Sequence, residues 1–279
     1  MRARCDWKLP RTSLPLGERT LIMGILNVTP DSFSDGGLYS DRDKAITRGR
    51  ELEQQGADII DVGGESTRPG SAGVTEDEET RRVLPVVEAL GRGIKVPISI
   101  DTYRAGVARR AIDAGAQIVN DISGFRFDDG MPQLVKDTRA GVVLMHSRGS
   151  RESLHKQSQM DDPLREVQEG LCGSVEKAKA AGISHDAIVL DPGIGFGKGA
   201  EESIHVLKNV SSFSTLGYPL LIGASRKSFM RSVITWTEEA RDWANAATAV
   251  FAIMSGVHII RVHEVRQARV IADVTDRLL

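Results

Sequence analysis

Polar side chains that could bind a ligand stand directly after short apolar runs in this sequence. Asp101, Asn120 and Asp191 each come immediately after such a run. A carboxylate can accept two N–H groups from the amino-imino edge of a flat heterocycle, and an amide can add a further hydrogen bond. Any one of these residues could instead cap the helix that follows it. Together they indicate a pocket for a nitrogen heterocycle.

A second group of residues at such positions is cationic. The chain has 36 basic and 38 acidic residues, a net charge of -2, so a local gathering of positive charge is informative. Guanidinium, ammonium and imidazole groups suit a phosphate or diphosphate and stabilise its departure as a leaving group. We expect such an anion site to use Arg68, Arg226, Lys227, Arg261 and His263.

Asn27 ends the first long apolar run and offers a side-chain oxygen to a hard cation. Mg²⁺ usually binds phosphates with only one or two protein ligands. A magnesium ion at Asn27 is therefore expected together with the diphosphate. Four other histidines show no metal-ligand spacing and are expected to be surface or packing residues; they are His155, His185, His205 and His258.

Two carboxylates, Asp61 and Glu65, could form an acid/base pair. The favoured interpretation is that Asp61 secures its own loop through hydrogen bonds to the backbone. Glycine-rich segments at 61–70 and 191–199 would allow a ligand to approach the backbone closely, but neither matches a Walker A or dinucleotide-binding pattern. Because there is also no nucleophile elbow, covalent catalysis is disfavoured.

These residues need a scaffold that brings the ends of many apolar runs together. Eight short apolar runs alternate with longer amphipathic stretches, which is typical of βα units with strands buried on both faces. Eight such units predict a (β/α)8 barrel, in which the carboxyl ends of the strands converge on one face. A doubly wound open sheet is the alternative. The expected strands are 21–26, 59–62, 98–100, 118–119, 142–145, 188–190, 220–222 and 259–262. The expected helices include 43–55, 76–90, 104–114, 163–181, 241–255 and 266–279.

Composition narrows the function classes. With 279 residues, 41% hydrophobic and 27% charged, the chain can bury a sizeable core and is neither disordered nor fibrous. The nearly balanced charge gives no overall field that would recruit nucleic acid or an anionic membrane. No run approaches 18 apolar residues, so a membrane span is not expected.

The cysteines and the first residues of the chain indicate a cellular compartment and a domain organisation. Only Cys5 and Cys172 occur, without a Cys-x-x-Cys pair, which favours a reducing cytoplasm. Residues 1–19 contain charges and prolines before any apolar run, so they are not a signal peptide. We expect 1–19 to be an extension packed on a single barrel domain, 20–279, with no room for a second enzyme domain.

Seven segments, in order along nearly the whole chain, closely resemble the dihydropteroate synthases of the pterin-binding enzyme family. They are MGILNVTPDSFSDGG at 23–37, DVGGESTRPG at 61–70, residues 99–124, LMHSRG at 144–149, DPGIGFGK at 191–198, IGASRKSF at 222–229 and RVHEV at 261–265. The resemblance implies a (β/α)8 barrel. It also implies a folate-pathway transferase that joins p-aminobenzoate to 6-hydroxymethyl-7,8-dihydropterin diphosphate, releasing diphosphate. Sulfonamides inhibit this class.

The same resemblance implies roles for individual residues. Pterin binding would fall to Asp101, Asn120, Ile122, Met145, Asp191 and Lys227. The p-aminobenzoate site would comprise Phe33, Thr67, Arg68, Pro69, Phe196 and Ser225, with Lys227 shared. Diphosphate, with Mg²⁺ on Asn27, would be held by Asn27, Thr67, Arg68, Arg226, Arg261 and His263. The residues expected to act in catalysis are Asp35, on a loop that closes over the reacting centre, and Asp101, Lys227, Arg261 and His263.

The expected reaction is SN1-like, because a dihydropterin ring can donate electrons to its exocyclic CH₂ while diphosphate leaves. One departure from the family pattern is Glu264, where an aspartate is common. No insertion flanks Pro69 or Phe196, so sulfonamide sensitivity is expected. A homodimer is expected through helices such as 241–255, although the apolar residues there could equally pack on the barrel.

Two other functions stay open at this point. One is a pterin-dependent methyltransferase, which would share the barrel and the heterocycle pocket but would not need residues 225–229 or the Arg261 and His263 pair. The other is a catalytically silent paralogue that only binds pterins. Loss of a loop or anion residue would favour the silent paralogue, but all of them are present.

Overall fold

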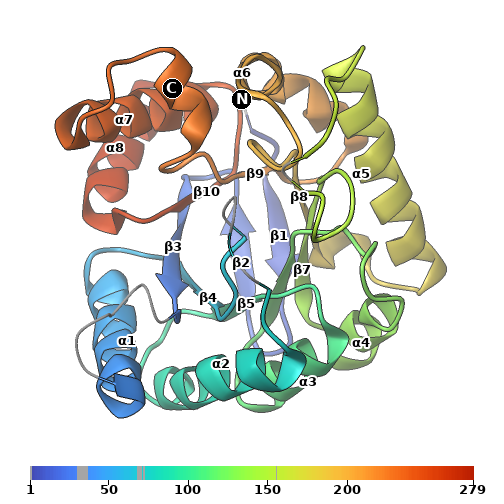
Figure 1. The fold of residues 1–279 in the computed structure, drawn as a ribbon, viewed down its shortest axis with the longest axis vertical. Coiled ribbons are helices and arrows are strands. Elements are labelled where there is room, and N and C mark those ends of the chain that lie inside the picture. The colour runs from blue at the N-terminus through green and yellow to red at the C-terminus, as the bar shows by residue number, and fades with distance from the viewer. Residues whose placement is uncertain (1, 30–36, 68–70, 72, 155) are drawn as a thin grey trace.

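The computed structural model describes residues 2–29, 37–67, 71, 73–154 and 156–279 (Figure 1). Its main sheet contains strands close to the expected apolar runs. They are β3 (Leu21–Asn27), β4 (Ile59–Gly63), β5 (Ile98–Asp101), β6 (Ile118–Asp121), β7 (Gly141–Met145), β8 (Ile188–Asp191), β9 (Leu221–Ile222) and β10 (Ile259–Val262).

The eight strands are parallel and close into a barrel. Their order is β8-β7-β6-β5-β4-β3-β10-β9. A parallel bridge joins Leu190 to Leu220, and the Leu190 N–H donates to the Pro219 carbonyl at 2.9 Å, so β8 meets the start of β9. This closure confirms the predicted (β/α)8 barrel and excludes the open sheet.

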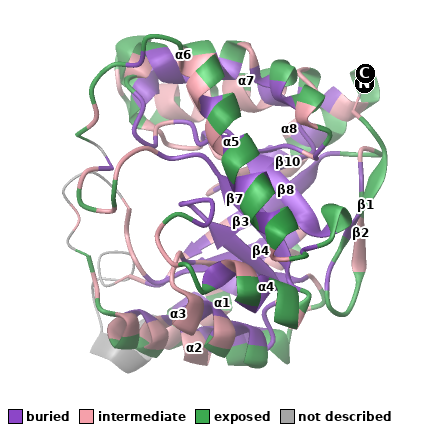
Figure 2. Cartoon of the chain, turned by 90° about the vertical axis from the view of Figure 1, so that its right-hand side faces the viewer, coloured by how far each residue is buried: buried purple, intermediate pink, exposed green. Residues whose placement is uncertain are grey.

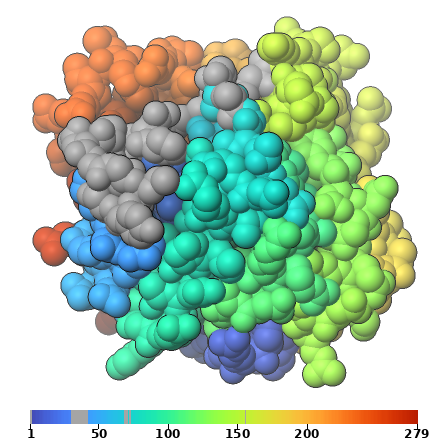
Figure 3. Space-filling view, turned by 60° about the horizontal axis from the view of Figure 1, so that its bottom comes forward, coloured from blue at the N-terminus to red at the C-terminus, as the bar shows by residue number. Residues whose placement is uncertain are grey.

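Helices lie between successive strands and surround the sheet. They are α1 (Gly37–Gln54), α2 (Glu76–Gly91), α3 (Ala105–Asp113), α4 (Met131–Thr138), α5 (Pro163–Ala180), α6 (Ala200–Lys208), α7 (Glu238–Met254) and α8 (Val265–Leu278). Short 3-10 turns occur at His185–Ala187, Val210–Leu216 and Ser228–Ser232. The outer surface follows chain order from α1 through α2 to α3 and α4, seen as the blue-to-green gradient in Figure 3. Among the helices described, none has the length and apolarity that crossing a membrane requires.

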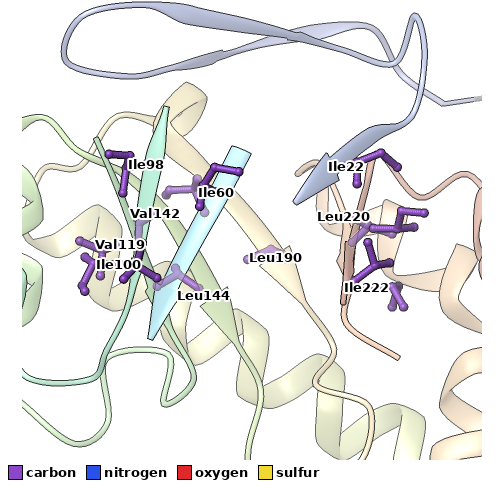
Figure 4. Close-up of a cluster of buried hydrophobic side chains, with 14 of the residues drawn as sticks. Ile22, Ile60, Ile98, Ile100, Val119, Val142, Leu144, Leu190, Leu220 and Ile222 are labelled. Atoms are coloured by element: carbon purple, nitrogen blue, oxygen red, sulfur yellow. The ribbon is translucent and has the colours of Figure 1, made fainter. Parts of the chain in front are cut away.

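Alternation along the strands divides the apolar residues into two layers. Because successive side chains point to opposite faces of a strand, Ile59 lies inside the barrel while Ile60 packs outward under the helices. Figure 4 shows part of the outer layer, including Ile22, Ile60 and Val142. The inner layer consists of Leu21, Met23, Ile59, Ile118, Val143, Val189, Leu221 and Ile259. Residues two positions further along each strand face the same interior, one layer nearer the carboxyl ends.

An N-terminal hairpin covers the opposite end of the barrel. Strands β1 (Cys5–Lys8) and β2 (Ser13–Leu16) pair antiparallel. Trp7 is 1% exposed, packs with the inner layer, and donates its indole N–H to the Ala187 carbonyl at 2.9 Å. Figure 2 shows this hairpin at the end of the barrel away from the long loops. The division into an extension (1–19) and one barrel domain (20–279) stays a prediction.

We predict that Trp7→Ala lowers the free energy of unfolding by about 3–5 kcal/mol, because it opens a cavity under the barrel and leaves the Ala187 carbonyl without its donor. Urea denaturation measures this loss. Lys8→Ala, on the same strand but exposed, serves as the control and should change stability by no more than about 0.5 kcal/mol. Equal effects of the two substitutions would show that the hairpin does not seal the barrel.

Candidate active site

Arg261 lies at the centre of the barrel mouth. Its Nε donates to Asp61 Oδ2 at 2.6 Å, and its Nη2 donates to Asp101 Oδ2 at 2.5 Å. Asn120 Nδ2 donates to the same Asp61 oxygen at 3.0 Å. These residues come from β10, β4, β5 and β6, and each follows an inward-facing position by two residues. The strand period therefore builds a polar layer directly above the apolar interior.

This layer has more negative than positive charge. The Asp61 side chain is fully buried, so one guanidinium faces two carboxylates with little water. Burial, reinforced by the neighbouring Asp61 and opposed by Arg261, raises the pKa of Asp101 to about 7. Burial alone would lower the pKa of Arg261, but the two carboxylates raise it, so the guanidinium stays charged.

Asp191 lies beside this centre at the end of β8. Its Oδ1 accepts the Gly193 N–H at 2.7 Å, and burial raises its pKa to about 6. Gly223 separates it from Arg261: a Cβ on that glycine would lie 3.8 Å from both Asp191 Oδ2 and Arg261 Cβ. The expected heterocycle residues Asp101, Asn120 and Asp191 thus surround Arg261.

The segment after β8 is held by a lysine that sequence reasoning missed. Lys198 Nζ donates to the carbonyls of Gly193 at 2.8 Å, Phe196 at 3.2 Å and His146 at 3.3 Å. Burial lowers the pKa of Lys198 to about 7. The only sequence signal for this role is the position of Lys198 at the end of a glycine-rich segment. Its partners are backbone carbonyls, so no particular side chain in the sequence marks them.

An apolar wall completes one side of the mouth. Ile122, Met145, Leu154 and Phe196 form a buried cluster, with Tyr103 packed against it. Lys227 Nζ lies 3.7 Å from the centroid of the Phe196 ring. The structure therefore brings together four residues expected to bind substrates: Ile122, Met145, Phe196 and Lys227.

The other expected anion residues are spread around the rim. Ser225 Oγ and His263 Nδ1 lie 3.1 Å apart. Arg226, which has a φ of 60°, is ion-paired with Glu264. Asn27 ends β3 opposite Gly63 of β4. Thr67 is half-buried after β4. The expected Phe33, Asp35, Arg68 and Pro69 lie outside the described residues.

Comparison with known proteins identifies the family. Residues 23–263 match the model of the family described as pterin binding enzyme. The dihydropteroate synthase of Bacillus subtilis (strain 168) is 44% identical over 268 residues, which cover 96% of this chain and 92% of that protein. The chain belongs to the dihydropteroate synthases.

Solved dihydropteroate synthases share the architecture. The Xanthomonas albilineans enzyme with 4-aminobenzoic acid has a TM-score of 0.92 at 36% identity, covering 99% of this chain and 98% of that one. The Yersinia pestis enzyme in a sulfonamide drug complex has a TM-score of 0.90 at 37% identity, covering 98% of each chain. The barrel mouth described above therefore belongs to an enzyme of this family.

One residue of the mouth, Asp61, differs from what the sequence suggested. The prediction that Asp61 bonds the backbone of its own loop is wrong: its partners are Asn120 and Arg261, because the strand period turns it inward above Ile59. His146 follows β7, but burial, together with Lys198 and nearby arginines, lowers its pKa to about 2, so it adds no positive charge.

We predict that Arg261→Ala destabilises the unliganded protein by about 3–5 kcal/mol at about pH 8, because it leaves the fully buried Asp61 and the partly buried Asp101 without their cation. The loss should shrink at about pH 5.5, since Asp101, with its pKa raised to about 7, takes up a proton there. Urea denaturation at both pH values measures this difference.

Arg81→Ala is the control for this experiment. Arg81 makes an exposed ion pair with Glu78, so its loss should cost less than about 1 kcal/mol at both pH values. A pH-independent loss for Arg261→Ala, or one no larger than this control, would contradict the assigned balance of charge.

Proposed function

We propose that the chain joins p-aminobenzoate to 6-hydroxymethyl-7,8-dihydropterin diphosphate, giving 7,8-dihydropteroate and diphosphate. The observation that carries this proposal is the ring of Asp101, Asn120 and Asp191 around Arg261, above the apolar interior of the barrel. As a dihydropteroate synthase, the protein is a transferase of folate synthesis.

The pterin is proposed to lie in the barrel mouth. Its adjacent N–H groups would donate to Asp101 and Asp191, and Asn120 would supply an amide. Met145 and Ile122, both nearly fully buried, would line the faces of the ring. The bound ring would add N–H donors to those that Asp101 and Asp191 already have from Arg261 and Gly193, and so would offset the cost of burying their charge.

The diphosphate is proposed to lie at the cationic rim. Arg261 Nη1 takes no part in the bonds to Asp61 and Asp101 and could donate to a phosphate oxygen. His263 and Ser225 form a second donor pair, with Thr67, Arg226 and the expected Arg68 around them. Their positive charge stabilises the leaving group as it departs.

Asn27 is the proposed protein ligand of Mg²⁺. No group of three or more His, Cys, Asp or Glu suited to a metal occurs in the parts of the chain that the structure describes. A single amide oxygen fits an ion that takes its other ligands from diphosphate and water. When bound, Mg²⁺ would neutralise charge that develops on the leaving diphosphate.

The proposed reaction is SN1-like. The C–O bond of the exocyclic CH₂ breaks, diphosphate keeps the electron pair, and the positive charge left on the pterin is stabilised by Asp101 and its carboxylate neighbours. The amine of p-aminobenzoate then attacks this carbon and loses a proton. Lys227, beside Phe196, would contact both substrates.

The p-aminobenzoate site is proposed to use Phe196, Ser225 and Thr67 with the expected Phe33, Arg68 and Pro69. Asp35 is proposed to act from the first loop, where closure would exclude water from the cation. The solved relative bound to a sulfonamide drug supports this chain as a sulfonamide target. Location in the cytoplasm remains a prediction from the two free cysteines.

We predict that the purified protein releases diphosphate and forms dihydropteroate only when dihydropterin diphosphate, p-aminobenzoate and Mg²⁺ are all present. A chelator should suppress turnover, and added Mg²⁺ should restore it. Lys227→Ala should lower kcat/KM by about 100-fold, because contacts to both substrates are lost. Diphosphate release and dihydropteroate are measured together.

Glu201→Gln, on the exposed start of α6, is the control for this assay. Pterin binding without product in the wild-type protein would favour the silent paralogue instead. Normal kcat/KM in Lys227→Ala would overturn the role of that lysine.

We also propose that two copies associate through α7 and α8. These helices pack side by side (Figure 1) and expose large apolar residues to solvent. The exposed residues are Trp243, Phe251, Met254, Val270, Val274 and Leu278. Several large apolar side chains exposed on two neighbouring helices are typical of a protein interface.

Met254→Arg combined with Val274→Arg should convert a dimer to a monomer, since each substitution places a charge in the apolar surface. Light scattering after size-exclusion chromatography measures the mass. Glu169→Arg, on exposed α5, should leave the dimer intact. A monomeric wild-type protein, or a double variant that is still dimeric, would exclude this interface.

A further inference from the structure

Glu65 binds three side chains from two other connections at the barrel mouth. It follows β4 by two residues, and its side chain is 4% exposed. Its Oε2 accepts from Arg104 Nη1 at 2.7 Å and from the Tyr103 hydroxyl at 3.1 Å. Its Oε1 accepts from Arg151 Nε at 2.5 Å. Tyr103 and Arg104 follow β5, and Arg151 follows β7.

The partners of Glu65 extend the network. Arg104 donates to the Val74 carbonyl at 2.7 Å and is ion-paired with Glu79, which is 1% exposed on its side chain. Arg151 Nη2 donates to the Ser66 carbonyl at 3.1 Å. Arg104 thus joins Glu65, at the start of the connection between β4 and α2, to Val74 near its end. Arg151 fixes the backbone directly before Thr67.

The charges in this network balance. Glu65 and Glu79 face Arg104 and Arg151, and all four side chains are less than one-fifth exposed. Buried charges are tolerated only when paired in this way, so loss of one partner leaves the others uncompensated. Among the described residues, two arginines and a tyrosine hydroxyl donate to the Glu65 carboxylate. We therefore assign Glu65 a structural role and not a role in acid/base chemistry.

The network touches the apolar wall of the active site. Tyr103 packs against the cluster of Ile122, Met145, Leu154 and Phe196. It also makes an edge-to-face contact with Phe127, with ring centroids 5.4 Å apart. The side of the mouth that carries Phe196 is therefore joined through Tyr103 to Glu65 and to the backbone beside Thr67.

We propose that Glu65 is a positioning residue that holds the connections after β4, β5 and β7 in one arrangement and so sets the place of the second substrate. The inference rests on the proposed function. The heterocycle residues Asp101, Asn120 and Asp191 are fixed by strands and do not contact Glu65. Loss of Glu65 should therefore weaken the binding of p-aminobenzoate more than the binding of the pterin substrate.

Glu65→Gln tests this proposal, because the amide keeps the shape of the side chain but turns an NH₂ toward an arginine. We expect the KM for p-aminobenzoate to rise about 10-fold and kcat to fall about 10-fold, since misplacing a reactant is costly. The dissociation constant of the pterin substrate should stay within about twofold, because the strands that hold it are unchanged.

Glu176→Gln is the control, because Glu176 accepts from Lys179 Nζ at 2.9 Å near the end of α5, where both side chains are exposed. It should leave both constants unchanged. Hydrogen exchange of 64–67 and 147–154 should become faster in Glu65→Gln and not in Glu176→Gln. This readout does not depend on activity.

Arg151→Met keeps the test decisive if Glu65→Gln fails to fold, because it breaks the contact between two connections and leaves Arg104 in place. It should also raise the KM for p-aminobenzoate, and the double variant should show less than the product of the single effects. The proposal is overturned if Glu65→Gln behaves like Glu176→Gln, or if Glu65→Gln weakens the binding of both substrates equally. A wild-type protein without synthase activity overturns the proposed function instead, while the exchange comparison still tests the network.

Discussion

The mouth of the barrel depends on one guanidinium that bonds two carboxylates, one fully buried and one partly buried. Arg261 bonds Asp61 and Asp101, and Asn120 shares the Asp61 oxygen, so four strands must keep their register for the layer to exist. The register pairs Asp101 with Asn120, whereas Asp61 is paired with Ser99, two residues before Asp101. Because the arginine cannot neutralise both acids, the layer retains an excess of negative charge that water does not screen. A ligand that supplies N–H donors, or that develops positive charge, is favoured at this place.

The two ends of the barrel meet different requirements. At one end Trp7 and its hairpin seal the apolar interior, so residues there serve stability. At the other end the same strands present polar side chains, and the connections beyond them carry buried ion networks such as that of Glu65. The apolar layer between the two ends keeps water from reaching the carboxylates from below. Stability and chemistry are therefore separated along each strand by only two residues, which is the general division of labour in this fold.

The sequence allowed the strands and most polar positions to be predicted because both depend on local pattern. Short apolar runs identify strands buried on both faces, and a polar residue after each run must lie near the converging ends. No residue range was predicted for the helices Met131–Thr138 and Ala200–Lys208, which have eight and nine residues and so few turns in which an apolar period can show. Ala105–Asp113 is as short, but its buried residues Val107, Ala108, Ala111 and Ile112 keep a clear helical spacing. Lys198 bonds backbone carbonyls, which any residue type provides. Asp61 bonds Asn120 and Arg261, which are far from it in the chain. No spacing in the sequence reports such contacts.

Acidic and basic side chains lie in different parts of the site. Asp61, Asp101 and Asp191 lie inside the mouth, whereas His263, Arg226 and Lys227 follow the strands and lie toward the rim. In the proposed binding mode, the ring of the substrate would lie near negative charge and its diphosphate near positive charge. This field would favour breaking the bond between them with the electrons moving toward the diphosphate. Two nitrogens of Arg261 bond the carboxylates, and in the proposed mechanism its third nitrogen would bind the diphosphate. Under that proposal, the residue that pairs with the acids of the mouth would also link the binding of the ring to the departure of the leaving group.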